Sequence, residues 1–134
     1  MTRKIVSCAC RIQAKQQHKL RLGNLAVCRD WGWAPEYVDA IWRILQHRSP
    51  DDFVIATGES HSLQEFVEAV FDELNLNWHD HVEYDESHRR LSDIAVSRGN
   101  HSKATTILGW RPAFKMHDVA RMMVRAELEI GGFD

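Results

Sequence analysis

Residues 53–74 read FVIATGESHSLQEFVEAVFDEL and decide the fold class. Residues 53–56 are apolar at every position, which is typical of a strand buried on both faces of a parallel sheet. After the turn at Thr57 and Gly58, Ser62 and Glu65 have the spacing of a capping box that begins a helix. Apolar residues then follow a helical period, namely Leu63, Phe66, Val67, Val70 and Leu74. The stretch therefore predicts one strand–turn–helix unit of an α/β fold.

The predicted strand at 53–56 has no partner of similar composition elsewhere in the sequence. A single parallel strand cannot form a sheet, so we expect it to lie at a sheet edge or to pair with another molecule. Ile5, Ala9 and Ile12 predict a helix that begins almost at the first residue. Because no loop precedes this helix, we expect the chain to be part of a longer protein.

The remaining pattern predicts further helices and short strands. In residues 18–22, charged residues alternate with leucine, which predicts a short strand that Gly23 and Asn24 end. Residues 94–97 are a candidate short strand. A helix is expected from Pro35, and a brief helix is expected to start with Asn100 or Ser102 as its cap and to end at Gly109. The apolar stripes of the two longer helices are Val38, Ile41, Trp42 and Leu45, and Val119, Met122, Met123, Ala126 and Ile130.

Composition limits the class of protein. The 134 residues form one domain or part of one, and 44% hydrophobic with 27% charged residues is typical of a globular protein. A net charge of -2 gives no general attraction for nucleic acid or for an anionic membrane. No apolar run approaches the length of a membrane span. The odd count of 3 cysteines favours a reducing compartment, and we expect a cytoplasmic protein.

Residues 22–38, LGNLAVCRDWGWAPEYV, indicate a ligand-facing loop. Trp31 and Trp33 are large and rigid, and Gly32 between them permits a close backbone approach. Arg29 carries five donors in a fixed fork, so its expected partner is a carboxylate or a phosphate. The alternative is an ordinary surface arginine that pairs with Asp30 or Glu36.

Residues 78–90, WHDHVEYDESHRR, concentrate histidines among carboxylates. In an extended segment, His79 and His81 would project to the same side, as metal ligands require, with His88 nearby. A polar, solvated loop explains the same residues, and no third ligand stands at a diagnostic spacing. Arg89 and Arg90, followed by Asp93, form a second candidate anion site.

Several catalytic signatures are absent from the sequence. It contains no Gly-rich dinucleotide fingerprint, no P-loop, no nucleophile elbow, and no tyrosine followed four residues later by lysine. The residues alone therefore predict an α/β chain with a candidate anion-binding face.

A series of motifs, in order, resembles the GDP-mannose 4,6-dehydratases, which are extended short-chain dehydrogenases/reductases. The motifs are TRKI at 2–5, LGN at 22–24, RDWG at 29–32, EYV and AIW within 36–42, DFVIATGE at 52–59, SLQEFVE at 62–68, and SKA, LGW and a proline within 102–112. The resemblance implies that residues 1–134 are the carboxyl-terminal, substrate-binding part, with the amino-terminal Rossmann half absent. The implied fold is an incomplete NAD(P)-binding Rossmann-like fold, mostly helical with a few short strands.

The resemblance also implies a reaction for the complete enzyme. Such a lyase uses NADP to oxidise the mannose at carbon 4, eliminates water across carbons 5 and 6, and returns the hydride to carbon 6. The catalytic Thr, Glu, Tyr and Lys belong to the missing half, so we expect this chain to bind GDP-mannose without turning it over and not to bind NADP tightly. A separate catalytic half or a homo-oligomer is the expected partner. The alternative is a non-catalytic, truncated remnant with weak or no nucleotide binding.

Five residues match the family's substrate-binding positions, and they are Lys4, Asn24, Arg29, Arg90 and Asp93. By resemblance, Arg29 and Arg90 contact the diphosphate, Asp93 accepts from the ribose hydroxyls, and Lys4 and Asn24 lie near the nucleotide. Two departures stand out. Residues 88–91 replace the family's aromatic pair, arginine and proline, and Asp93 replaces a glutamate that is one methylene longer.

Overall fold

The computed structural model describes residues 1–88 and 94–131, which are mostly helical with a few short strands, as predicted. The elements in chain order are α1 (Thr2–Gln13), β1 (Leu20–Leu22), β2 (Cys28–Arg29), α2 (Ala34–Gln46), β3 (His61–Ser62), α3 (Leu63–Glu73), η1 (Trp78–Asp80), β4 (Val82–Tyr84), η2 (Glu86–His88), α4 (Ser102–Leu108) and α5 (Met116–Gly131). Within these ranges, no helix combines the length and the apolar character that crossing a bilayer requires.

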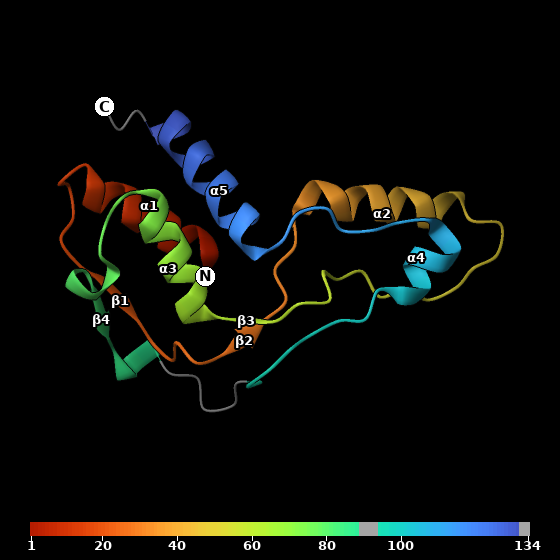
Figure 1. Ribbon diagram of the computed structural model, residues 1–134, viewed down its shortest axis with the longest axis horizontal. Helices are drawn as coiled ribbons and strands as arrows, with labels where there is room; N and C mark the ends of the chain where they lie inside the picture. Colours follow the sequence, from red (N-terminus) through yellow and green to blue (C-terminus); the bar gives the residue numbers. More distant parts are fainter. Residues whose placement is uncertain (89–93, 132–134) are drawn as a thin grey trace.

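The main core lies between α1, α3 and α5, which gather at one end of the elongated molecule (Figure 1). Ile5 and Ala9 of α1, Phe66 and Val70 of α3, and Val124 of α5 are fully buried there. The predicted apolar faces of α1 and α3 are thus confirmed. The burial of these side chains stabilises the fold through the hydrophobic effect.

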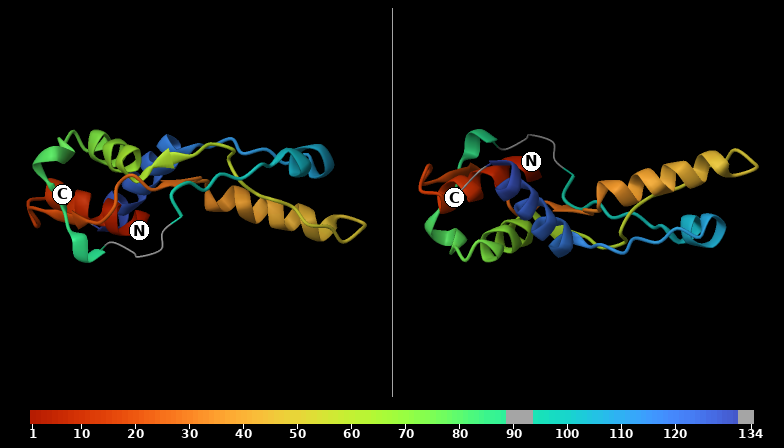
Figure 2. Two further views of the ribbon diagram at one scale, coloured as in Figure 1. Left: turned by 90° about the horizontal axis from the view of Figure 1, so that it is seen from below. Right: turned by 90° about the horizontal axis from the view of Figure 1, so that it is seen from above.

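A second, smaller core lies at the other end of the molecule, where α2 and α4 project away from the three-helix group (Figure 2). It consists of Ala40, Ala104 and Trp110, with Phe53 and Ile55 packed against them. The indole Nε1 of Trp110 donates to the carbonyl of Glu36 at 2.9 Å, so the one polar atom of this buried ring is satisfied.

Two small sheets flank the main core. β1 pairs with β4 in parallel, with Leu20 opposite Val82, and β2 pairs with β3 antiparallel, with Cys28 opposite Ser62. The candidate strand at 94–97 is reduced to a single parallel bridge between Cys28 and Val96. Residues 94–97 therefore run beside β2.

The predicted strand at 53–56 does not form. Within the described residues, no backbone hydrogen bond pairs these four residues with another segment. Phe53 and Ile55 pack into the second core, Val54 is 54% exposed, and Ala56 is buried beside Gly99. The predicted strand is therefore wrong, because none of the described segments pairs with these residues.

The end signals of the helices are largely confirmed. Ser62 and Glu65 form the predicted capping box, and Gly109 ends α4 with a left-handed φ of 64°. The start of α4 differs, because His101 is its N-cap and Asn100 instead accepts a hydrogen bond from the Ser102 N–H at 2.9 Å. Asn100 thus shapes the turn that precedes the helix.

Candidate functional site

Arg29 lies in β2 and is half-buried. Its Nη1 donates to the carbonyl oxygen of Cys28 at 2.8 Å and to that of Ile94 at 2.6 Å. Ile94 directly follows Asp93 in the sequence. The guanidinium therefore contacts the first described residue after the segment that carries Arg90 and Asp93.

The carboxylate of Asp30 holds the loop after β2 in place. Its Oδ1 accepts from both the N–H and the hydroxyl of Thr57, at 2.8 and 2.7 Å. Its Oδ2 accepts from the N–H groups of Gly58, at 2.9 Å, and Gly99, at 3.4 Å. One side chain thus joins the Arg29 loop to two segments that are distant in the sequence.

Glu36, the other suggested partner of Arg29, also accepts hydrogen bonds from backbone N–H groups. Its carboxylate accepts from the N–H groups of Ala113 and Phe114, at 2.7 and 3.3 Å. The hydrogen bonds of Asp30 and Glu36 thus join the α2 region to later segments of the chain.

Both tryptophans of this loop are half-buried. The Trp31 ring lies 5.3 Å from that of Phe66 in the main core, and Trp33 is the N-cap of α2. The close approach expected at Gly32 is to Tyr37, because a Cβ at Gly32 would lie 2.4 Å from the Tyr37 hydroxyl oxygen. Trp31 therefore fixes the loop to the core, and Gly32 is needed for the contact with Tyr37.

Lys4 and Asn24 both lie beside the end of β1. Lys4 is exposed on α1 and its Nζ donates to the Arg21 carbonyl at 3.0 Å. The Oδ1 of Asn24 accepts from the Ala26 N–H at 2.9 Å, which closes the turn between β1 and β2. The structure therefore brings both residues to the β1–β2 connection.

Arg90 and Asp93 lie outside the described residues. The described chain on either side of them is anchored at two places. Before them, β4 pairs with β1, and after them the Ala95 carbonyl accepts from the Cys28 N–H of β2 at 2.7 Å. In the sequence, the segment that carries Arg90 and Asp93 therefore lies between β4, which pairs with β1, and residues 94–97, which run beside β2.

The histidine segment does not have the expected extended form. Residues 78–80 form the helical turn η1, in which the His79 ring stacks on Trp78 at 3.9 Å. The Nδ1 of His81 lies 3.1 Å from the His18 carbonyl oxygen. Among the described residues, which exclude the His88 side chain, no three His, Cys, Asp or Glu residues converge as metal ligands do.

Titratable groups gather at the start of α3. Glu65 has a pKa lowered to about 2, because it accepts from the backbone and hydroxyl of Ser62 and contacts His61 at 3.2 Å. The pKa of Glu59 is also lowered, chiefly by its contact with Lys115 at 3.0 Å. The Nζ of Lys115 also donates to the Thr57 carbonyl at 2.7 Å. These contacts stabilise the turn between Thr57 and α3.

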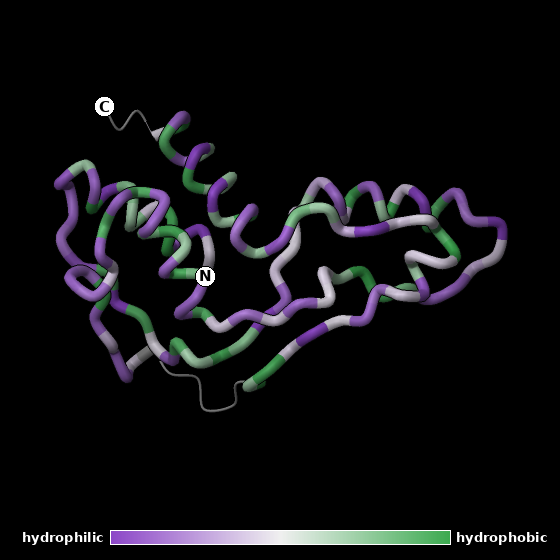
Figure 3. The backbone as a smooth tube through the Cα atoms, in the orientation of Figure 1, coloured by the Kyte–Doolittle hydropathy of each residue, from purple (hydrophilic) through white to green (hydrophobic). Residues whose placement is uncertain are grey.

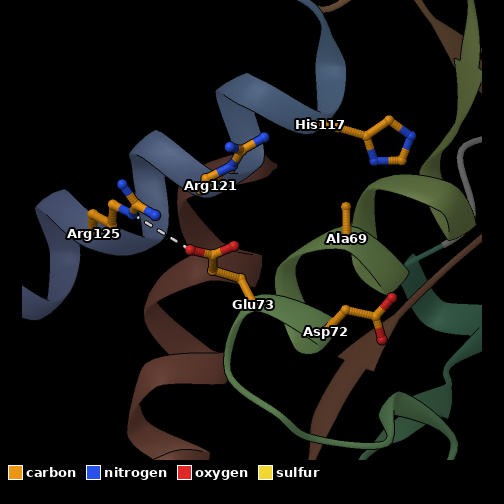
Figure 4. A pocket seen from close by; sticks show the side chains of 6 residues that line it. All are labelled: Ala69, Asp72, Glu73, His117, Arg121 and Arg125. Carbon is orange, nitrogen blue, oxygen red and sulfur yellow. Dashed lines mark hydrogen bonds and ion pairs between the residues drawn. The ribbon is translucent and has the colours of Figure 1, made fainter.

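A hollow of about 390 Å³ lies between α3 and α5. Figure 4 shows that its basic side chains come from α5 and its acidic ones from α3. Arg125 pairs with Glu73 at 3.4 Å, and Arg121 pairs with Asp118 at 3.2 Å. The positive charges already have carboxylate partners, so this hollow is a poor anion site.

Comparison with known proteins identifies the family. The sequence profile of the family described as GDP-mannose 4,6 dehydratase matches residues 1–123. The chain belongs to this family. It is 44% identical over 130 residues to GDP-mannose 4,6 dehydratase 1 of Arabidopsis thaliana, covering 97% of this chain and 36% of the relative. With the human GDP-mannose 4,6 dehydratase it shares 36% over 147 residues, covering 97% and 40%.

Solved structures agree on the fold of this GDP-mannose 4,6 dehydratase family member. RMD from Pseudomonas aeruginosa, solved with NADPH, has a TM-score of 0.82 at 19% identity and covers 92% of this chain and 41% of that chain. The dTDP-glucose 4,6-dehydratase from Bacillus anthracis, solved with NAD, has a TM-score of 0.77 at 18% identity, covering 93% and 39%. The chain spans about two-fifths of the length of the proteins that it matches.

Within the family's RDWG motif, sequence reasoning missed the role of Asp30. It treated this residue as a partner for Arg29, whereas the carboxylate accepts from Thr57, Gly58 and Gly99. A signal was present, since Thr57 and Gly58 belong to a second family motif, DFVIATGE. When two motifs each follow a strand-like segment, residues of the two motifs can be expected to hydrogen-bond to one another even when the motifs are far apart in the sequence.

Proposed function

We propose that this chain is the GDP-sugar-binding part of a GDP-mannose 4,6-dehydratase, which converts GDP-mannose to GDP-4-keto-6-deoxymannose, and that it is inactive alone. Membership of the family supports the substrate class. The observation that carries the site assignment is the 2.6 Å hydrogen bond from Arg29 to the Ile94 carbonyl. This bond joins the RDWG loop to the chain segment of Arg90 and Asp93.

Each candidate residue has a chemical role in the proposal. Arg29 and Arg90 contact the diphosphate, because guanidinium forks complement phosphate oxygens in a bidentate manner. Asp93 accepts hydrogen bonds from the ribose diol. Lys4 and Asn24, beside the β1–β2 connection, lie at the nucleotide end of the site. The Asp30 network holds the backbone that carries Arg29.

NADP serves the complete enzyme in this proposal, but the residues of this chain do not fit it. A dinucleotide site needs a Gly-rich turn between a parallel strand and a helix, where the phosphates meet the helix N-terminus. The only parallel ladder in the described ranges joins β1 and β4, and β1 is followed by the Asn24 turn. We therefore assign cofactor binding to the part of the family's length that this chain does not match.

GDP-mannose is thus the proposed ligand, and a separate catalytic half or a homo-oligomer is the proposed partner, in the cytoplasm. One observation favours the alternative of a non-catalytic remnant. Residues 88–91 lack the aromatic pair and the proline of the family's segment, so Arg90 loses the stiffness that would preorganise it. The remnant would bind nucleotide weakly or not at all.

The experiment incubates the purified chain with GDP-mannose and NADP and follows the sugar nucleotide by chromatography. We expect no conversion by the chain alone. Conversion should appear when the part of the Arabidopsis relative that this chain does not match is supplied as a second polypeptide. Turnover by this polypeptide alone would overturn the proposal, and absence of conversion in the mixture as well would favour the remnant.

A further inference from the structure

Basic residues are concentrated in the first part of the sequence. Residues 1–29 contain 7 of the 17 Lys and Arg residues and none of the 19 Asp and Glu residues, which gives them a formal charge of +7. Residues 30–134 hold the other 10 basic residues and all 19 acidic ones, and their formal charge is -9. The net charge of -2 therefore combines two regions of opposite sign. Such an asymmetry indicates a local surface for a charged partner.

Four of these basic side chains are exposed along α1 and β1, and we call them the basic surface. They are Arg11, in the last turn of α1, Lys15, just after α1, and Lys19 and Arg21, just before and within β1. Lys19 and Arg21 lie on the same side of the strand, since both contact Glu83. In Figure 3 the connection from α1 to β1 is mostly hydrophilic, at the end of the molecule away from α2. The basic surface thus continues from the helix into the strand.

The positive charge of the basic surface is only partly neutralised. The Glu83 carboxylate lies 3.5 Å from both Lys19 and Arg21, and these three side chains are between 42% and 68% exposed. Within residues 1–88 and 94–131, no carboxylate pairs with Arg11 or Lys15. Four cations thus share one paired carboxylate, and the surface keeps a net positive charge.

The basic surface borders the nucleotide end of the proposed site. Lys4 lies on α1 two turns before Arg11, which is about 10 Å along the helix axis. The Nζ of Lys4 donates to the Arg21 carbonyl at 3.0 Å. Asn24, which closes the β1–β2 turn, follows Arg21 three residues later. An anion that is drawn to the basic surface is therefore brought close to Lys4 and Asn24.

Charges at this distance act on a ligand before it binds. Electrostatic attraction extends over about 8 Å at physiological ionic strength and over about 30 Å at about 0.01 M salt. A surface of one sign beside a binding site raises the association rate of an oppositely charged ligand by about tenfold or more. Both phosphates of a nucleoside diphosphate carry negative charge, so a ligand of this class is attracted.

We propose that the basic surface attracts the diphosphate of a GDP-sugar toward Lys4 and Asn24 and speeds its association, without contacting the bound ligand. This inference rests on the proposed function. A small anion fits the charge distribution better than nucleic acid or an anionic membrane does, because an extended polyanion would also meet the region whose formal charge is -9. The basic surface thus acts on the rate of binding and not on the contacts in the complex.

The test measures the association of GDP with the purified 134-residue chain by stopped flow, through the tryptophan fluorescence of the protein. Calorimetry gives the dissociation constant of the same samples, which must follow because it is the ratio of the dissociation rate to the association rate. The test variant is Arg11→Glu combined with Lys15→Glu. The matched control is Arg48→Glu combined with Arg111→Glu, which changes the charge equally at exposed positions beside α2 and α4.

All four substituted side chains are exposed, so we expect both double variants to fold, and far-UV circular dichroism checks this. Arg11→Gln combined with Lys15→Gln is a milder second variant. It removes the two charges without reversing them, so its association rate should fall in the same direction but less.

At about 0.01 M salt we expect the test variant to associate with GDP about tenfold more slowly than the wild type and the control. The difference should shrink to within about twofold at about 1 M salt, where attraction extends over only about 3 Å. An unchanged association rate, an equal loss in the control, or a loss that persists at high salt would overturn this inference alone. A wild type that does not bind GDP would overturn the proposed function together with it.

Discussion

Asp30 and Thr57 are joined twice through a single carboxylate oxygen, since Oδ1 of Asp30 accepts from the Thr57 N–H at 2.8 Å and from the Thr57 hydroxyl at 2.7 Å. Thr57 is 2% exposed, so its N–H depends on this partner in place of water, while its hydroxyl also lies 3.4 Å from the Glu59 carbonyl oxygen. The pair connects the loop after β2, which carries Arg29, to the turn before α3. The geometry around Arg29 therefore depends on a residue that touches no proposed ligand.

Replacing Asp30 by alanine should lower the free energy of unfolding by about 2–3 kcal/mol, because it removes the acceptor of the Thr57 and Gly58 N–H groups. Urea unfolding followed by circular dichroism measures the change. Asp39→Ala is the control, since Asp39 makes an exposed pair with Arg43 at 2.9 Å and should cost no more than about 1 kcal/mol. Equal effects of the two substitutions would contradict the role assigned to Asp30.

Trp110→Phe should destabilise the chain by about 1–3 kcal/mol, because the Glu36 carbonyl loses the indole donor that lies 2.9 Å away. Trp42→Phe is the matched control, since Trp42 is 61% exposed and the same change there should stay within about 0.5 kcal/mol. Both values come from urea unfolding. A Trp110→Phe variant as stable as the wild type would show that the second core does not rely on this bond.

Stability should fall in acid through Glu65. Its pKa is about 2 in the folded chain, against an ordinary value of 4.5, so the carboxylate favours the folded state most fully above about pH 4.5. That contribution is lost as pH falls from 4.5 toward 2. The stability difference between the wild type and Glu65→Gln should therefore be constant above pH 4.5 and shrink below it.

Unfolding measured across this range, with Glu129→Gln on the exposed end of α5 as control, checks the capping role of Glu65. A difference between the wild type and Glu65→Gln that does not change between pH 5 and pH 2 would contradict the assigned pKa of about 2.

Local signals in the sequence predicted the helices well. The capping box at Ser62 and the glycine end of α4 depend on neighbouring residues only, and both are confirmed. The periodic burial of Ile5, Ala9 and Ile12 likewise follows from the 3.6-residue repeat of a helix. These features need no information about distant parts of the chain.

Predictions that required a distant partner were less successful. The strand at 53–56 needs a neighbouring strand, and none of the described segments supplies one. The sequence showed the apolar stripe of α2 but not that Trp42 and Leu45 would be exposed, since a pattern does not reveal what covers it. The ties of Asp30 to Thr57 and Gly99 are also long-range. Of the five predicted site residues, Lys4, Asn24 and Arg29 lie in described segments beside β1 and β2, while Arg90 and Asp93 stay predictions.

The central claim is that this chain binds the diphosphate of a GDP-sugar. A calorimetric titration of the purified chain with GDP, with guanosine as the comparison ligand, tests it most directly. We expect heat with GDP and none with guanosine, because the guanidinium groups recognise the diphosphate. Arg29→Ala should weaken GDP binding by about tenfold or more, since a hydrogen bond to a charged group contributes about 1.5–3 kcal/mol. Arg48→Ala, at an exposed position after α2, should leave the affinity unchanged. Absence of heat at millimolar GDP, or an Arg29→Ala variant that binds like the wild type, would contradict the account.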